Sequence, residues 1–600
     1  MKDLFSYPFD AGLLLKKQKS LKKQLKGDGR ERTPVRIAIL SGSTADAVRD
    51  QLELFLLNYG LEPSFYLSEY GKYWEDAMFP PETLIEFSPD LVYFHTTYRN
   101  IEYFPTLAET PEAVEKGIDG EILRYKAMWE SVRDKLGAAV IQNNFELPPF
   151  RLLGNMDASD PHGRVRTVDE LNRRFAEYAA SEKSFYLNDL RYISACYGLD
   201  RWADSAAWLL YKYALALPAI PFLAANLAAI VKAIYGKNKK VLALDLDNTL
   251  WGGVVGDDGV EGLRLGRDLP AGQVYSEFQE YVKLHKDLGV LLTVCSKNDA
   301  ANALAGLAHP DSLLKPDDFT VIKANWENKD RNLAETAAEL NLLTESFVFA
   351  DDNPAEREIV REQLPGTAVP ELTAPEEYIR VLDRNRYFET VSLSADDRER
   401  GEMYRANAAR AALEKTYADY GEYLDGLSMT AEIMPFAPPY LGRIAQLTNK
   451  SNQFNLTTRR YTEAEITAIA DDPERIALYG RLSDRFGDNG VVAVVIGRVE
   501  GEALHLDLWL MSCRVLKREM ELAMLDEVVR RAKERGIAKI FGYYRPTAKN
   551  GMVKELYGDF GFKKVAESEE ETVWKLAVND HFPKTKHITV THDCTEGKDG

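Results

Sequence analysis

The sequence predicts an α/β chain of three domains: a doubly wound parallel sheet, a second Rossmann-like parallel sheet, and a C-terminal α+β domain. The first observation is length, because 600 residues correspond to three or four domains of ordinary size. The second is the alternation of strand-like and helix-like segments that begins at Val35. The third is a meander of strand-like segments between residues 476 and 511.

Pattern and composition place the boundaries between these parts. We expect a basic helical segment at residues 1–33, followed by two α/β domains at residues 34–236 and 237–394. A polar helical linker at residues 395–426 then leads to an α+β domain at residues 427–577 and a tail at residues 578–600. The first segment holds the lysine-rich run Lys16–Lys23 without an apolar stretch beside it, so it does not read as a signal peptide.

Four strand-like segments predict a parallel sheet in the first α/β domain: Val35–Leu40, Leu91–His95, Ala138–Gln142 and Phe185–Leu187. This order resembles a flavodoxin-like or SGNH-hydrolase-like layer. Ser43 stands where a serine nucleophile would, but the absence of histidine between His162 and His285 leaves such a triad broken. We therefore expect Ser43 and Thr44 to cap the first helix. The apolar stretch 206–234 predicts buried helices rather than a membrane span.

The run Val241–Leu250 places two carboxylates, Asp245 and Asp247, where a buried strand should end. Alternate side chains of a strand share a face, so both lie together at the carboxyl edge of the sheet. One carboxylate can attack phosphorus while its neighbour carries the proton, and the pair attracts Mg²⁺. This pattern indicates phosphoryl transfer.

Three later fragments have matching chemistry. A second strand ends in Cys295-Ser296-Lys297-Asn298, which offers a hydroxyl and N–H groups to a phosphate oxygen. Lys329 follows and can neutralise phosphate. A third strand then runs into Asp351-Asp352. These four fragments occur in the order that one phosphoryl-transfer site would need, which makes it improbable that they are unrelated surface residues.

The segments "LALDLDNTLWGGVVGDDG", "VCSKND", "NWENKDRNL" and "FADDNPAERE" resemble the haloacid dehalogenase (HAD) superfamily, most closely its FkbH-like branch, over residues 238–390. The resemblance implies a catalytic and phosphate-binding set whose nucleophile is Asp245 and whose general acid/base is Asp247. The phosphate-binding residues would be Thr249, Ser296, Lys297, Asn298 and Lys329. The Mg²⁺ site would use Asp245, the backbone carbonyl of Asp247, Asp351 and Asp352.

Spacing indicates an open site. Asp245 and Ser296 are 51 residues apart, and a flap plus one helix occupy most of that length. No room is left for a cap domain, since independent domains rarely fall below about 50 residues. An open site favours phosphate carried on a large partner, or a protein thiol that must reach the substrate.

The C-terminal segments resemble the GNAT acetyltransferase fold, with Asn550 and Leu556-Tyr557 similar to that family's last helix. The phosphate loop would be Arg514–Glu519, where Lys517 and Glu519 replace the small residues that such a loop needs. Pantetheine or acyl-CoA contacts would fall on Cys513, Arg514, Lys517, Arg518, Asn550 and Tyr557. A working acyl-transfer module and a docking domain are both open.

Composition limits the class of protein. The chain has 75 basic and 94 acidic residues, a net charge of −19, which argues against non-specific nucleic-acid binding. Its four cysteines show neither disulfide nor zinc spacing, so we expect a cytoplasmic protein with no membrane partner.

The FkbH-like resemblance implies an enzyme that dephosphorylates a three-carbon acyl unit, like that of 1,3-bisphosphoglycerate, and loads it as a thioester on an acyl carrier protein in polyketide-type biosynthesis. Cys295, beside Ser296, is the candidate catalytic thiol, with Lys297 lowering its pKa. One alternative is a phosphatase for a sugar or acyl phosphate in polysaccharide or secondary-metabolite assembly. Another is a GNAT-type acyltransferase with a structural HAD domain.

Overall fold

The computed structural model describes residues 4–393, 400–414, 416–451, 453–512, 515–547 and 549–591. This part of the chain forms two compact units, one of residues 4–237 with 389–391 and one of residues 238–388 with the described residues from 392 onward. Three separate sheets lie within them. The predicted α/β class with parallel sheets is confirmed.

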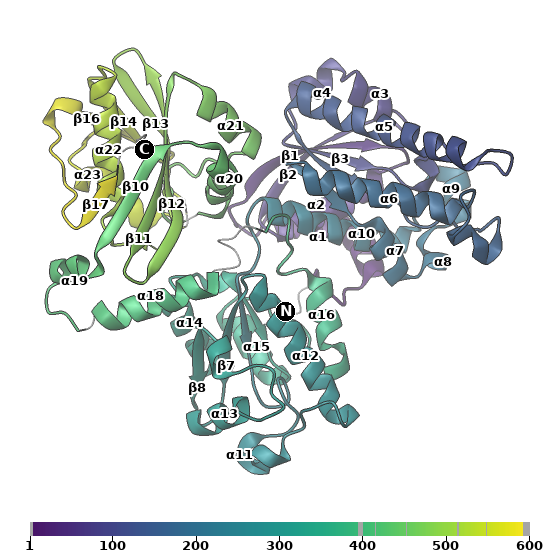
Figure 1. The fold of residues 1–600 in the computed structure, drawn as a ribbon, viewed down its shortest axis with the longest axis horizontal. Helices are drawn as coiled ribbons and strands as arrows, with labels where there is room; N and C mark the ends of the chain where they lie inside the picture. The colour runs from purple at the N-terminus through teal and green to yellow at the C-terminus, as the bar shows by residue number, and fades with distance from the viewer. Residues whose placement is uncertain are drawn as a thin grey trace, which may run out of the picture. The chain divides into compact units, whose positions relative to one another are not determined.

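The N-terminal unit contains a five-stranded parallel sheet of order β2-β1-β3-β4-β5 (Figure 1). Its strands are β1 Thr33–Ser41, β2 Leu61–Leu67, β3 Leu91–His95, β4 Ala139–Asn143 and β5 Phe185–Asn188. Strand β2 was not predicted, because Pro63 interrupts its apolar pattern. It lies at the edge of the sheet, where a missing N–H is tolerated.

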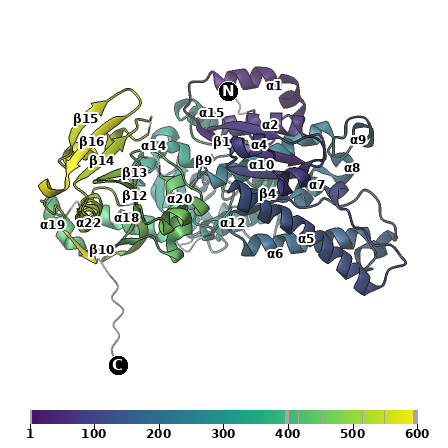
Figure 2. The same ribbon diagram turned by 90° about the horizontal axis from the view of Figure 1, so that it is seen from above.

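Helices cover both faces of this sheet (Figure 2). On one face pack α1 Ala11–Lys26, α2 Asp46–Asn58 and α10 Ile220–Ile234. On the other pack α5 Pro111–Leu136 and α6 Arg164–Ser181. The basic segment expected at residues 1–33 is therefore part of this unit, since Leu14, Leu21 and Leu25 of α1 are buried in its core.

Two local predictions for this unit were wrong. Ser43 and Thr44 do not cap α2, which begins after Ala45 without a side-chain cap; the Thr44 hydroxyl donates instead to the Tyr211 carbonyl. Helix α9, Ser205–Tyr211, has no buried residue, although the segment was expected to be buried. One helical stretch, Leu217–Ile234, is long and apolar enough to cross a membrane, and 72% of it is buried inside the protein.

The second unit begins with a four-stranded parallel sheet of order β8-β7-β6-β9. Its strands are β6 Val241–Leu244, β7 Leu291–Ser296, β8 Val321–Ala324 and β9 Phe347–Ala350. The associated helices are α12 Pro270–Asp287, α13 Ala300–Leu307, α14 Lys329–Glu339, α15 Pro354–Gln363 and α16 Tyr378–Asn385. Because β6 is flanked by β7 and β9, the loops after all three strands meet at one edge.

Helices α18 Arg400–Glu414 and α19 Tyr420–Leu427 lead to an eight-stranded sheet of order β15-β16-β14-β13-β12-β11-β10-β17. Its strands are β10 Met429–Pro435, β11 Arg475–Asp484, β12 Gly487–Glu500, β13 Ala503–Met511, β14 Lys539–Tyr544, β15 Lys563–Glu567, β16 Thr572–Ala577 and β17 Ile588–Thr591. Its helices include α20 Leu441–Lys450, α21 Glu463–Asp471 and α22 Met520–Glu534. The expected tail thus contributes a strand, β17, which pairs with β10.

Candidate active site

Asp245 leaves the central strand β6 at the carboxyl edge of its sheet. Its backbone N–H donates to the Ala350 carbonyl at 3.0 Å, so strand pairing with β9 continues up to the carboxylate. Asp245 is buried. The nucleophile predicted from the sequence is therefore fixed by the ladder of the sheet rather than by a mobile loop.

Three carboxylates converge at this edge. Oxygen atoms of Asp245, Asp351 and Asp352 lie within 4.8 Å of one another. Burial and the charge of Asp245 raise the pKa of Asp351 to about 6, and burial, followed by the charge of Asp245, also raises the pKa of Asp352. Asp245 and Asp351 are buried and Asp352 is half-buried. A cluster of oxygen ligands that repel one another fits Mg²⁺, which prefers carboxylate and carbonyl oxygens.

Lys329, the first residue of α14, balances part of this charge. Its ammonium lies 2.9 Å from Asp245 Oδ1 and 2.5 Å from Asp351 Oδ2, and the residue is buried. Burial alone would lower the pKa of Lys329, but the two carboxylates raise it above its ordinary value. The lysine therefore stays charged and can face a phosphate bound to Asp245.

The carboxylate of Asp247 is held from two directions. Trp251 Nε1 donates to Oδ1 at 2.8 Å and the Val255 N–H donates to the same oxygen at 3.1 Å. Asn298 Nδ2 donates to Oδ2 at 3.0 Å. Burial raises the pKa of Asp247, although the hydrogen bonds from Val255 and Trp251 oppose the shift. A half-buried carboxyl with raised pKa suits proton transfer to a leaving group.

Several predicted phosphate ligands make internal contacts. The Thr249 hydroxyl accepts from the Asp352 N–H at 3.2 Å, and Lys297 Nζ pairs with Glu356 Oε1 at 2.7 Å. Ser296 is buried at the end of β7. The structure brings all of these residues to the same sheet edge; their contact with phosphate stays a prediction.

Cys295 does not have the environment expected for a reactive thiol. It is buried, and its Sγ donates to the Lys329 carbonyl at 3.5 Å. Burial raises the pKa of the Cys295 thiol well above its ordinary value, and the charge of Lys329 does not offset this. Lys297 is paired with Glu356, so the expectation that it lowers this pKa was wrong.

Sequence reasoning missed three residues that support the site. They are Trp251, whose indole holds Asp247; Arg357, whose guanidinium donates to the carbonyls of Asp351 and Asp352; and Tyr378, whose hydroxyl donates to the Asn248 carbonyl. Only Trp251 had a local signal, because it stands four residues after Asp247. The other two depend on the packing of α15 and α16.

The predicted pantetheine contacts in the C-terminal sheet are largely internal. Cys513 and Arg514 lie outside the described residues. Arg518 is buried and pairs with Asp484 at 3.2 Å, and burial lowers its pKa to about 10. The Asn550 amide donates to the carbonyls of Asn455 and Arg545, Tyr557 is buried in the core, and Lys517 has a φ of 64°.

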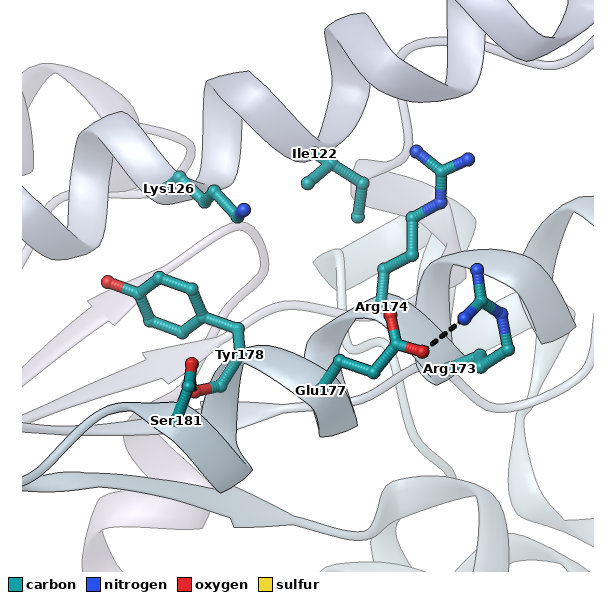
Figure 3. A pocket seen from close by; sticks show the side chains of 7 residues that line it. All are labelled: Ile122, Lys126, Arg173, Arg174, Glu177, Tyr178 and Ser181. Carbon is teal, nitrogen blue, oxygen red and sulfur yellow. Dashed lines mark hydrogen bonds and ion pairs between the residues drawn. The ribbon is translucent and has the colours of Figure 1, made fainter.

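One further hollow, of about 370 Å³, lies between α5 and α6 of the N-terminal unit (Figure 3). Its two arginines already have carboxylate partners: Arg173 pairs with Glu170 and Glu177, and Arg174 with Glu115, Asp119 and Glu170. These two arginines therefore have little free charge to offer a ligand.

The fold and the site together define a HAD-like phosphatase domain. The N-terminal part of the protein BF1531 from Bacteroides fragilis, which contains a phosphatase domain complexed with Mg, is 31% identical, with a TM-score of 0.58 over 62% of this chain and 99% of that one. The chain belongs to the family of that phosphatase-domain protein. No family model and no curated protein matches.

Two acetyltransferase structures match about 25% of the chain, in its C-terminal part. They are the ribosomal-protein-S18-alanine N-acetyltransferase from Escherichia coli, covered over 94% of its length, and PaiA N-acetyltransferase from Thermoplasma acidophilum in complex with coenzyme A, covered over 99%. Each is 14% identical, with TM-scores of 0.20 and 0.19. Such low scores do not establish a shared activity.

Proposed function

We propose that the chain is a Mg²⁺-dependent phosphoryl-transfer enzyme that uses Asp245 as nucleophile. The observation that carries the proposal is the arrangement of Lys329 between Asp245 and Asp351, with Asp352 beside them. This arrangement offers a nucleophile, a fixed cation and a set of metal ligands within one buried cluster.

Each residue has a definite task in this reaction. Asp245 attacks phosphorus to form an aspartyl-phosphate while the bond to the leaving oxygen breaks. Asp247 gives its proton to that oxygen, and then takes a proton from the water that attacks the aspartyl-phosphate, which frees Asp245 and releases inorganic phosphate. Asp245, Asp351 and Asp352 would hold Mg²⁺, which would stabilise the charge on the phosphoryl oxygens. Lys329 supplies a second positive charge at the same place.

For the substrate, we infer the FkbH-like reaction. A carrier-protein thiol attacks the acyl carbon of a compound such as 1,3-bisphosphoglycerate; the carbon–sulfur bond forms, the bond from that carbon to the phosphate oxygen breaks, and inorganic phosphate leaves with the thiol proton. The remaining phosphate monoester is hydrolysed through Asp245. The short stretch between Asp245 and Ser296 supports this proposal, because it leaves room for a carrier protein to approach. In this reading the accepting thiol belongs to the carrier, since Cys295 is buried with a raised pKa.

A phosphatase for a small sugar or acyl phosphate is the second candidate. The cluster of Asp245, Asp351 and Asp352 is sufficient for it, because hydrolysis needs no thiol. For the C-terminal sheet we propose a GNAT-like docking domain, supported by its parallel β13–β14 pair and by the internal bonds of Arg518 and Asn550. Phosphopantetheine of the carrier is the group that such a domain would meet.

The test incubates the full chain with 1,3-bisphosphoglycerate, Mg²⁺ and a phosphopantetheinylated carrier protein, and follows phosphate release together with the mass of the carrier. A glyceryl mass on the carrier supports the first candidate. Phosphate release without added mass supports the second. If an Asp245→Asn variant hydrolyses the phosphate monoester at the wild-type rate, both candidates are wrong, because an amide cannot form the aspartyl-phosphate.

A further inference from the structure

The N-terminal sheet reverses its strand order beside β1. The chain runs from β1 to β2 on one side and continues with β3 on the other, and the helices that follow β1 and β3 pack on opposite faces. The loops after β1 and β3 therefore lead to opposite faces of the sheet. In open α/β sheets, ligands bind in the crevice between two such loops, at the carboxyl ends of the strands. The two loops touch here, since Asn100 Nδ2 donates to the Gly42 carbonyl at 3.3 Å.

Two arginines at this edge have no carboxylate partner among the described residues. Arg99 follows β3, and its guanidinium lies 4.4 Å from the Trp208 ring centre and 5.0 Å from that of Tyr98. Arg164 begins α6 and lies 3.9 Å from the Phe104 ring centre and 5.0 Å from that of Phe150. The Nε atom of each is buried without a hydrogen bond. Aromatic rings thus orient both guanidinium groups but leave their donors unused.

Other arginines of the same unit behave differently. Arg124 pairs with Glu121 at 2.6 Å and Arg133 with Glu182 at 2.6 Å. Arg124 and Arg133 thus have carboxylate partners, whereas Arg99 and Arg164 at this edge do not. A guanidinium group without an ion pair is suited to bind a carboxylate or a phosphate in bidentate fashion.

Glu146 lies in the loop after β4. Burial raises the pKa of Tyr98, and the charges of Arg99, Glu146 and Arg164 also act on it, which places all three groups around this one residue. Glu146 is 1% exposed; one oxygen accepts from the Tyr98 N–H at 3.4 Å and the other, Oε1, has no partner. Burial raises the pKa of Glu146 to about 7, with Arg99 acting against the shift. Ser43, in the loop after β1, is 2% exposed and its hydroxyl also lacks a partner. Buried polar atoms of this kind are costly unless something binds them.

We propose that Arg99, Arg164 and Glu146 form a binding site for a small organic anion that carries hydroxyl groups. The guanidinium groups pair with its carboxylate or phosphate. The free oxygen of Glu146 accepts a hydrogen bond from a ligand hydroxyl, and Ser43 lies in the neighbouring loop as a further donor. This site belongs to the N-terminal unit and does not depend on the proposed phosphatase reaction.

The experiment titrates the full chain, without Mg²⁺, with D-glycerate, glycerol 3-phosphate and inorganic phosphate in a calorimeter. D-glycerate tests a carboxylate with hydroxyls, glycerol 3-phosphate tests a phosphate with hydroxyls, and inorganic phosphate tests the anion alone. We expect saturable binding of at least one hydroxylated probe. Arg99→Met and Arg164→Met should each weaken it about tenfold or more, since a charge-assisted pair is lost.

Arg174→Met is the matched control, because that arginine already has carboxylate partners, and it should bind as the wild type does. Glu146→Gln should weaken the hydroxylated probes but not inorganic phosphate. The proposal is overturned if no hydroxylated probe binds at millimolar concentration, or if both arginine variants, shown to be folded by circular dichroism, bind with wild-type affinity. Binding lost equally in Arg174→Met also overturns it. Phosphatase activity is measured separately. It shows whether a negative result concerns the anion site of the N-terminal unit or the proposed active site around Asp245.

Discussion

The indole N–H of Trp251 donates to the Asp247 carboxylate at 2.8 Å, and this bond joins the flap after β6 to the proposed general acid/base. Trp251 is fully buried, and a Cβ at Gly306 would stand 2.8 Å from its ring, so α13 holds the indole in place. Because Asn298 binds the other oxygen of Asp247, rotation of this carboxylate is blocked from two sides. The orientation of the proton donor is therefore built into the flap.

Replacement of Trp251 by phenylalanine should lower kcat for alkyl phosphates by about tenfold, because the acid/base step that it orients contributes about 10²–10⁴ in rate. Aryl phosphates need less help from an acid and should lose less. Steady-state kinetics with both substrate classes measures the difference. Trp509→Phe is the control, since Trp509 is also fully buried but its indole N–H has no partner. An equal loss in both variants would mean that the effect is structural.

Lys329→Met should reduce kcat by about 10²-fold or more, in line with the loss of one fixed donor to developing charge. It also leaves Asp245 and Asp351 without their counter-charge, so the variant should unfold at lower denaturant concentration at pH 7 than the wild type. Urea titration and turnover assays check the two effects. Lys323→Met, which removes a lysine paired with Glu335 and Glu339, should change neither activity nor stability much.

Cys295→Ala should keep both phosphate release and acyl transfer within a few-fold of wild type. The thiol is buried and its pKa is raised, so little thiolate forms at neutral pH. The paired assay is phosphate release and mass spectrometry of the carrier protein, with the exposed Cys196→Ala as control. Loss of acyl transfer with intact phosphate release would identify Cys295 as an acyl carrier after all.

The strand ends of the phosphatase domain could be predicted from the sequence because each is a short apolar run followed at once by its polar residues. Asp245, Ser296 and Asp351 therefore needed only local information. The contact of Trp251 with Asp247 depends on how the flap folds, and Arg357 reaches the Asp351 carbonyl only because α15 packs beside β9. Strand β2 and helix α9 were misjudged because Pro63 hides an edge strand and because the apolar residues of α9 remain exposed.

Magnesium should stabilise the protein more at pH 7.5 than at pH 5. The pKa of Asp351 is raised to about 6, so without metal the folded state binds a proton more tightly than the unfolded chain, and this stabilisation is lost as the pH rises from about 4 to about 6. At pH 7.5 the Asp351 carboxylate is ionised and Mg²⁺ can offset its charge. At pH 5 a proton on the same carboxylate competes with Mg²⁺ for it. Thermal unfolding with and without Mg²⁺ at both pH values measures this. The difference should vanish in Asp351→Asn but persist in Asp318→Asn, which lies outside the metal cluster.

Glu146→Gln should remove a pH dependence of stability that originates in the N-terminal unit. The pKa of Glu146 is raised from 4.5 to about 7, so the folded state holds a proton that the unfolded chain has lost, and stability falls as the pH rises through this interval. A shift of this size corresponds to at most about 3 kcal/mol. Glutamine keeps the shape of the protonated acid and carries no charge, so the variant should match the wild type at pH 4.5 and exceed it at pH 8. Urea unfolding at the two pH values gives the comparison. The control is Glu109→Gln, a partly exposed carboxylate whose pKa is lowered, chiefly by the Thr106 N–H. A wild type that is as stable at pH 8 as its glutamine variant would show that the Glu146 carboxylate is already compensated when charged, for example by a bound cation or by Arg99.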